Sequence, residues 1–250
     1  MRIKNSIMLL AIDIGNTRIK AAVFEQNTLV ELFIFTKEAL LTEINYILNK
    51  FPKIKSLVVA SVGNVEKELF LSLKSKVEIH FITHESKFPF TNLYSTPTTL
   101  GIDRMVLASG AVIQFPNQNR LVIDAGTCIT YDFIDENDNY LGGAISPGIR
   151  LRYESLHQKT AKLPLLTKKN PENFIGNSTQ ESIHSGVING VALEIDGFIE
   201  LYKAQYAKFI IILTGGDAEF LAIQLKNTIF ANSNFLLEGL NQTFQYNQND

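Results

Sequence analysis

The sequence contains a short apolar run that ends in an aspartate and a glycine turn, an arrangement suited to phosphate binding. The run 7–12 leads into the segment Asp13, Ile14, Gly15, Asn16, Thr17, Arg18, Ile19 and Lys20. Glycine lets the backbone approach a ligand closely, and short polar side chains with a lysine add donors for phosphate. Asp13 would repel phosphate, so we expect it to act through Mg²⁺ or a metal-bound water. Taken alone, an ordinary hairpin turn explains the segment equally well.

Two later segments repeat this chemistry. Ile123 to Thr127 again places an aspartate, Asp124, before a glycine and a threonine, and Thr214 to Ala218 carries paired glycines between a predicted strand and a predicted helix. Paired glycines before a helix allow a flat or phosphorylated ligand to pass close to the backbone. A second carboxylate near polyphosphate is unfavourable unless a cation neutralises it. Together the three turns favour a nucleotide site over three unrelated loops.

The elements that must position these turns occur twice in the same order. Apolar runs predict strands at 7–12, 18–25, 29–35, 57–61 and 77–82, and again at 121–124, 129–134, 140–145 and 209–213. Helical spacing predicts helices at 37–50, 65–76, 103–115, 149–159, 179–206 and 218–226, and a short, frayed one at the C-terminus. The pattern predicts an α/β protein of two duplicated halves, residues 1–117 and 118–250, each with a mixed sheet flanked by helices. We expect a cleft between the halves, with both aspartate turns at its mouth.

Composition excludes several classes of protein. The 250 residues are 46% hydrophobic and 19% charged, with a net charge of −2, which is typical of a globular protein with a full core. The sequence has no excess of basic residues, which would be the sign of a nucleic-acid partner. A single cysteine excludes an internal disulfide and a zinc site of several thiolates. No run approaches the roughly 18 apolar residues of a membrane span, so we expect a cytoplasmic protein without a membrane anchor.

The ordered set of motifs resembles the type III pantothenate kinases of the acetate and sugar kinase, heat-shock chaperone and actin superfamily. The two aspartate turns resemble the first and second phosphate motifs of that family. The other matching segments are Leu100 to Arg104 with Tyr94 and Pro97 upstream, Gly142 to Gly148, Thr160 to Pro164, Gly176 to Thr179, and Thr214 to Ala218. The departure is Cys128, where the family pattern has a small residue, and we expect this cysteine to serve packing.

The resemblance implies ribonuclease H-like/actin-like halves and a specific reaction. The γ-phosphoryl group of ATP would pass to the primary hydroxyl of pantothenate and give 4'-phosphopantothenate, the first step of coenzyme A biosynthesis. Asp13 to Lys20 and Thr127 would hold ATP, and Asp124 would bind a monovalent cation, K⁺ or NH₄⁺, in addition to Mg²⁺. Asp103 would be the general base, and the pantothenate site would comprise Tyr94, Gly101, Ile102, Asp103, Arg104 and Thr179.

The implied roles of Asp103 and Arg104 are chemically coherent. Phosphoryl transfer depends mostly on positioning and charge neutralisation, so a weak base that aims the hydroxyl suffices. Arg104 can pair with the substrate carboxylate in bidentate fashion. The alternative is structural, because an aspartate in the first turn of a helix complements the helix dipole.

The resemblance also implies a homodimer. The predicted helix 179–206 agrees, since apolar residues on more than one of its faces predict a second apolar contact.

Two other functions stay open: a regulatory protein on the same scaffold, as an accessory factor for transcription, and a phosphohydrolase of the same superfamily. His80 and His84 are too far apart on a strand, at about 13 Å, to share a metal ion, and we expect them at the surface or at a sheet edge.

Overall fold

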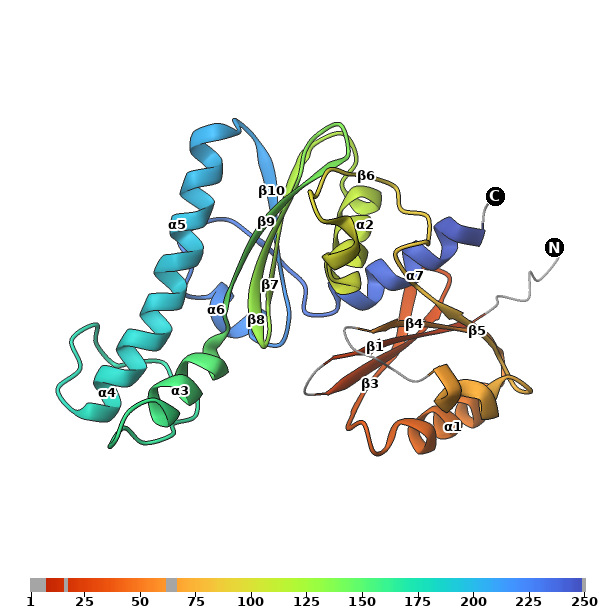
Figure 1. Ribbon diagram of the computed structural model, residues 1–250, viewed down its shortest axis with the longest axis horizontal. Coiled ribbons are helices and arrows are strands. Elements are labelled where there is room, and N and C mark those ends of the chain that lie inside the picture. The colour runs from red at the N-terminus through yellow and green to blue at the C-terminus, as the bar shows by residue number, and fades with distance from the viewer. Residues whose placement is uncertain (1–7, 16–17, 62–66, 249–250) are drawn as a thin grey trace. The chain divides into compact units, whose positions relative to one another are not determined.

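The computed structural model describes residues 8–15, 18–61 and 67–248, which form two compact units. The first unit comprises the described residues up to Pro116, the short segment Asp138–Tyr140 and the C-terminal helix α7 (Phe235–Gln248) (Figure 1). The second comprises Asn117–Asn137 and Leu141–Ser233. Within the described part of the chain, no helix is both long and apolar enough to cross a membrane.

The first unit is built on a five-stranded mixed sheet. Its strands are β1 (Met8–Ile14), β2 (Ile19–Glu25), β3 (Thr28–Phe35), β4 (Ile54–Ser61) and β5 (Glu78–Phe81), in the order β3-β2-β1-β4-β5. β1 lies at the centre, antiparallel to β2 and parallel to β4. Six of its seven residues are buried, which explains why its sequence is a continuous apolar run instead of an alternating one.

Helices cover both faces of this sheet. Alternate β1 residues such as Leu10 and Ile12 share a core with α1 (Leu40–Lys50) and the 3₁₀ helix η1 (Lys67–Leu73). On the opposite face α2 (Ile102–Gln114) contacts β4, and α7 contacts β1, β2 and β4. A Cβ on Gly110 of α2 would lie 2.9 Å from the Gly239 Cα of α7, so glycines allow these two helices to approach closely. Of the helix predicted over 65–76, residues 65–66 lie outside the described residues, residues 67–73 form η1, and residues 74–76 form a turn.

The position of α7 differs from the predicted division of the chain at residue 117. We expected residues 118–250 to form one half with a frayed C-terminal end, but α7 has 14 residues and belongs to the first unit. Its apolar side chains Phe235, Leu237 and Leu240 are buried. The Thr243 hydroxyl also donates a buried 2.8 Å hydrogen bond to Ser109 of α2. Apolar burial therefore returns the end of the chain to the unit in which it began.

The second unit contains a sheet with the same connectivity. Its strands are β7 (Asn119–Ala125), β8 (Cys128–Ile134), β9 (Asn139–Pro147), β10 (Phe209–Thr214) and β11 (Phe230–Ala231), in the order β11-β10-β7-β8-β9. β6 (Thr91–Asn92), which the sequence did not predict, pairs with Asn139 and Tyr140 of β9. β7 is antiparallel to β8 and parallel to β10, as β1 is to β2 and β4. The predicted duplicated halves are confirmed.

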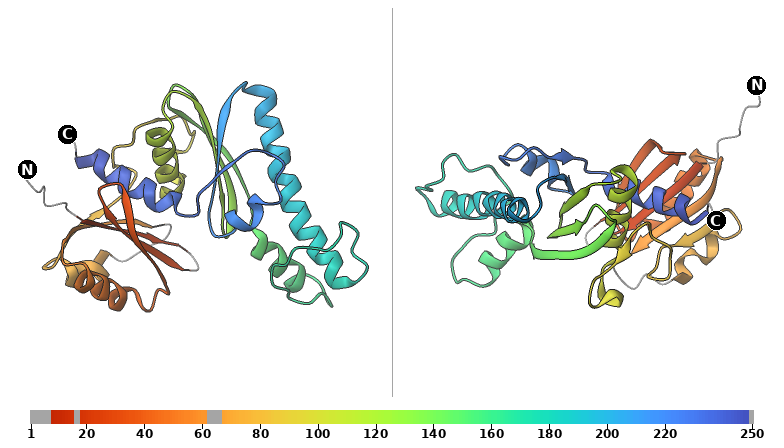
Figure 2. Two further views of the ribbon diagram at one scale, coloured as in Figure 1. Left: turned by 180° about the vertical axis from the view of Figure 1, so that it is seen from behind. Right: turned by 90° about the horizontal axis from the view of Figure 1, so that it is seen from above.

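One face of the second sheet is covered by helices. These are α3 (Ile149–Gln158), α4 (Thr179–His184), α5 (Gly190–Gln205) and α6 (Ala218–Ala222), whose apolar side chains share one core with β7, β8 and β10. In Figure 1 and in the left view of Figure 2, α5 runs along this sheet. The long helix predicted over 179–206 is interrupted by a π turn at Ser185–Asn189. There the Asn189 amide donates to the Ser185 hydroxyl at 3.1 Å, and that hydroxyl donates to the carbonyl of Phe174 at 2.5 Å.

Candidate active site

The first aspartate turn lies at the end of β1. Asp13 is only 8% exposed and is the register partner of Lys20 on β2, so the carboxylate and the amine project from the same face of the sheet. A Cβ on Gly15 would lie 3.1 Å from the Arg18 carbonyl oxygen, which leaves little room for a side chain. The structure thus brings together the acidic and basic residues that the sequence proposed for ATP.

The other predicted residues of this turn have different environments. Ile14 and Ile19 face each other across β1 and β2 and are buried in the core, so only their backbone groups are available to a ligand. Arg18 is exposed. Asn16 and Thr17 lie outside the described residues, and their predicted contacts with ATP stay predictions.

The second aspartate occupies the equivalent place at the end of β7. Asp124 is flanked in register by Thr130 on β8 and by Thr214 on β10, which lie on the same face of the sheet. The hydroxyl oxygens of both threonines are buried and accept or donate no hydrogen bond among the described residues. A carboxylate therefore stands between two buried hydroxyl groups, a set of hard oxygen donors that suits a simple cation.

Three glycine segments meet around Asp124 and Thr127. Gly215 has a φ of +97°, and a Cβ there would lie 2.4 Å from the Asp124 Oδ1. The Asp217 N–H donates to the Ala125 carbonyl at 2.9 Å, and the Gly148 N–H donates to the Thr127 carbonyl at 3.0 Å. The absence of side chains at Gly148 and Gly215 thus permits these contacts, and the second and third glycine motifs of the sequence lie side by side.

The predicted base lies in the first turn of α2, within the first unit. The Asp103 Oδ1 accepts a hydrogen bond of 2.9 Å from the backbone N–H of Arg104. Burial raises the pKa of Asp103, and the opposing effects of the Arg104 N–H and guanidinium are smaller. A Cβ on Gly101 would lie 2.3 Å from the Asp103 Oδ1, so a glycine is needed for this carboxylate to take its position.

Two of the predicted pantothenate contacts lie next to each other. The Arg104 guanidinium lies 5.8 Å from the centre of the Tyr94 ring, within range of a cation–π contact, and only 6% of Arg104 is exposed. Ile102 is buried and can contribute only its backbone. The structure therefore brings together Tyr94, Gly101, Asp103 and Arg104 in one unit.

His84 is part of this region and is exposed, as the sequence predicted. Its Nε2 donates to the carbonyl of Leu100 at 2.8 Å, just before the Gly101 turn. No local pattern in the sequence predicts this contact, because His84 lies 16 positions before Leu100 and only the fold brings the two together.

Cys128 differs from expectation, since its side chain is exposed at the start of β8 and does not fill a core position.

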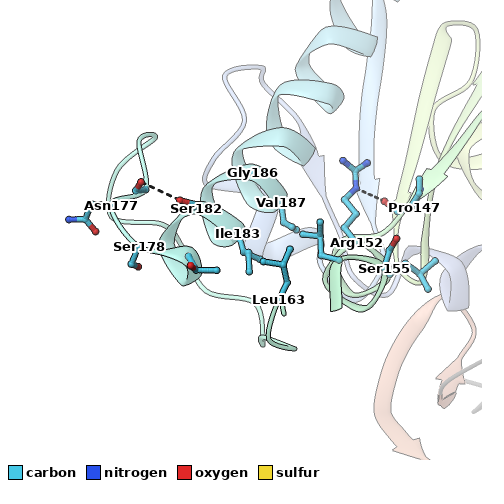
Figure 3. A pocket seen from close by; sticks show the side chains of 14 residues that line it. Pro147, Arg152, Ser155, Leu163, Asn177, Ser178, Ser182, Ile183, Gly186 and Val187 are labelled. Carbon is cyan, nitrogen blue, oxygen red and sulfur yellow. Dashed lines mark hydrogen bonds between the residues drawn. The ribbon is translucent and has the colours of Figure 1, made fainter. Parts of the chain in front are cut away.

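Thr179, the last predicted contact, belongs to the second unit. It begins α4, whose N-terminus is capped by Ser178: the Ser178 hydroxyl oxygen accepts from the Glu181 N–H at 3.2 Å. Thr179 lines an open pocket of about 1060 Å³ between α3 and α4 (Figure 3). Arg152, Leu163, Ser178 and Ile183 are among the other lining residues.

The chain is similar to known proteins over nearly its full length. A profile described as type III pantothenate kinase matches residues 9–201. The chain belongs to the type III pantothenate kinase family. Two curated members are 67% identical, from Flavobacterium johnsoniae, and 63% identical, from Flavobacterium psychrophilum. Each alignment covers 96% of this chain, and 98% and 99% of the respective relatives.

Solved structures of the wider fold are also similar to this family member. A Campylobacter jejuni protein assigned to the Baf family of transcriptional activators is 25% identical, with a TM-score of 0.62 over 96% of this chain and all of the other. A glucokinase from an Antarctic psychrotroph has a TM-score of 0.54 at 11% identity over 96% and 99% of the two chains, a likeness of fold alone. These neighbours agree with the duplicated actin-like architecture.

Proposed function

We propose that this protein transfers the γ-phosphoryl group of ATP to the primary hydroxyl of pantothenate, giving ADP and 4'-phosphopantothenate, the first step of coenzyme A biosynthesis. Beyond family membership, the observation that carries the proposal is the partly buried Asp103 carboxylate beside Arg104 and Tyr94. The raised pKa of Asp103 makes it a better base than an exposed aspartate. The hydroxyl oxygen forms a bond to the γ-phosphorus, the bond from that phosphorus to ADP breaks, and Asp103 takes the hydroxyl proton.

ATP would be held by the two aspartate turns. The backbone N–H groups and polar side chains of residues 14–17, with Lys20, are suited to the phosphates, and Thr127 on the second turn supplies an exposed hydroxyl. Arg18 is exposed, so its side chain is accessible to a ligand. Phosphoryl transfer needs mainly such positioning and neutralisation of charge, which a set of donors and cations provides.

Pantothenate would lie against Tyr94 and the Gly101–Arg104 turn, with Thr179 as a further contact. Its carboxylate is complementary to the Arg104 guanidinium, which can bind both carboxylate oxygens. The tight Gly101 turn leaves room for the hydroxyl to approach Asp103.

Cations would complete the site. Asp13 is placed to bind Mg²⁺ directly or through water, and Mg²⁺ would neutralise charge on the phosphates. K⁺ or NH₄⁺ would lie at Asp124, where the buried hydroxyl groups of Thr130 and Thr214 supply further oxygen donors. These donors fit a weakly hydrated monovalent ion, and the ion would offset the second carboxylate near the phosphates.

We also propose a homodimer, in the cytoplasm, where ATP is supplied. Leu193 and Leu201 of α5 are 64% and 68% exposed, although the opposite face of the helix is buried in its own core. Apolar side chains on a second face are suited to contact with another copy of the chain.

Formation of ADP from ATP, measured with and without pantothenate, tests the function. Release of ADP only with pantothenate is expected for the kinase. Release without it would indicate a phosphohydrolase, and no release under either condition would indicate a regulatory protein on the same scaffold.

A further inference from the structure

A single peptide group connects α3 to the second nucleotide turn. The N–H of the Pro147–Gly148 peptide donates to the Thr127 carbonyl at 3.0 Å, and the carbonyl of the same peptide accepts from the Arg152 Nε at 2.9 Å. Figure 3 shows the Arg152 side chain reaching from α3 to this carbonyl. Because a peptide group is planar, fixing its oxygen also fixes the direction of its N–H. Arg152 therefore determines how Gly148 presents its donor to Thr127.

The fit around this peptide leaves little freedom. A Cβ on Gly148 would lie 2.2 Å from the Gly126 carbonyl oxygen and 2.5 Å from that of Thr127. The backbone of Gly148 thus lies directly against both residues of the turn. A change in the tilt of the Pro147–Gly148 peptide would be transmitted to the turn, since no side chain or space separates them.

Arg152 is itself held by residues of two further elements. Its Nη2 donates to the Glu194 carboxylate of α5 at 2.6 Å and to the Ser146 hydroxyl at 2.9 Å. The other Glu194 oxygen accepts from the Tyr131 hydroxyl at 3.1 Å, and Tyr131 lies on β8, the strand that follows the turn. The hydrogen bonds form a closed ring, from Thr127 through Gly148, Arg152 and Glu194 to Tyr131 and back along β8.

The ring contains one ion pair, between Arg152 and Glu194. Burial acts to raise the pKa of Glu194, but hydrogen bonds from Arg152, Ser146 and Tyr131 outweigh it and lower that pKa. Glu194 is therefore ionised at neutral pH. Arg152 and Glu194 are both mostly buried, so their charge-assisted hydrogen bonds are stronger than those of an exposed pair.

We propose that Arg152 is a positioning residue for ATP, acting with Glu194 through the Pro147–Gly148 peptide to fix the Thr127 turn against the phosphates. The inference rests on the proposed contact of Thr127 with ATP. Arg152 does not touch the nucleotide in this scheme; it sets the geometry of the turn before ATP binds.

The test compares Arg152→Gln with Arg150→Gln. Arg150 lies on the same helix and forms an exposed ion pair with Glu154, so it matches the loss of one arginine without the contacts to Pro147 and Glu194. We expect Arg152→Gln to raise the KM for ATP about tenfold or more, because a turn that is not fixed in advance must be ordered when ATP binds. We expect kcat at saturating ATP to change less, and Arg150→Gln to resemble the wild type.

Further variants separate positioning from stability and from the nucleotide assignment. Glu194→Gln should also raise the KM for ATP. The double variant should raise this KM by less than the product of the two single fold-changes, since both substitutions disrupt one ring. An Arg152→Gln protein with a lowered Tm but an unchanged KM for ATP would overturn the proposal. If Thr127→Ala raises that KM while Arg152→Gln does not, only positioning fails. If Thr127→Ala has no effect, the proposed Thr127 contact fails and the route through it fails as well.

Discussion

The Asp103 carboxylate accepts a 2.9 Å hydrogen bond from the backbone N–H of Arg104, the residue that follows it in the first turn of α2. This bond favours the ionised carboxylate, but burial disfavours it more, and the pKa of Asp103 is raised. An ionised Asp103 therefore lowers the stability of the folded protein. A destabilising charge of this kind is typical of a group that takes part in chemistry.

Replacing Asp103 with Asn should separate activity from stability. We expect turnover with pantothenate to fall by about 10²–10⁴-fold, the usual contribution of a positioned base. The Tm should be equal to or higher than that of the wild type, because the amide oxygen can still accept the Arg104 N–H without a buried charge. Asp103→Ala, which removes that acceptor, should be less stable than Asp103→Asn. Wild-type turnover by Asp103→Asn would reject the assignment of the base.

The raised pKa of Asp103 also predicts the direction of pH effects. Only the ionised carboxylate can accept the hydroxyl proton, so kcat/KM should fall as the pH decreases through the raised pKa. Because the folded state binds this proton more tightly than the unfolded state, the contribution of Asp103 to stability is present below the unfolded pKa and is lost as the pH rises through the folded pKa. Tm measured against pH for wild type and Asp103→Asn should differ in this sense. Curves with no difference would contradict the burial argument.

Local patterns in the sequence predicted the strands, the repeat and the two aspartate turns, because each depends on neighbouring residues. Continuous apolar runs mark buried central strands, and glycines mark the turns that follow. The equivalent register positions of Asp13 and Asp124 follow from the duplicated connectivity. Tyr94 and Arg104 are in contact, although they are 10 positions apart in the chain and the sequence gave no geometric reason for it; their roles toward pantothenate stay predictions.

Contacts between distant segments were not predictable in this way. The place of α7 in the first unit depends on the fit of Gly239 against Gly110, which no local pattern reveals. His84 contacts Leu100, and Arg152 contacts Glu194, only because the fold brings them together. The π turn at Ser185–Asn189 likewise depends on a hydrogen bond to Phe174, which lies outside the helix. An α-helical spacing could not anticipate it.

The oxygen donors around Asp124 predict a dependence on monovalent cations. Activity should require Mg²⁺ together with K⁺ or NH₄⁺ and should fall in buffer that contains only Na⁺. Thr214→Val removes one buried hydroxyl that has no hydrogen-bond partner among the described residues, so it should increase the K⁺ concentration needed for half-maximal activity. Its Tm without K⁺ should not decrease, because an unsatisfied buried hydroxyl costs stability. Full activity with Na⁺ alone, or an unchanged K⁺ requirement in Thr214→Val, would contradict this role.

The close approach of Gly148 to the second nucleotide turn predicts a large effect of one methyl group. In Gly148→Ala the added Cβ would meet the Gly126 carbonyl at 2.2 Å, so the backbone must shift. We expect a loss of about 1–3 kcal/mol or more in the free energy of unfolding, measured with urea, together with weaker ATP binding. Gly197→Ala in α5 is the control, because its Cβ would meet no atom of the described residues within 4 Å and alanine favours a helix. Equal stability of the two variants would contradict the observed fit.

The exposed leucines of α5 predict the state of assembly. We expect light scattering to give twice the 28.0 kDa mass of the chain, and specific activity to fall on dilution as the dimer dissociates. Leu193→Lys and Leu201→Lys place charges on side chains that are 64% and 68% exposed within one copy, so they should leave the fold intact and weaken the dimer. Leu69→Lys, at a leucine of η1 that is 44% exposed, is the matched control and should keep the mass of the wild type. A 28.0 kDa particle with undiminished activity would reject both the dimer and any site that depends on it. Dimers that resist both α5 substitutions would instead place the interface on another surface, because a buried lysine without a partner cannot be accommodated without a large loss of affinity.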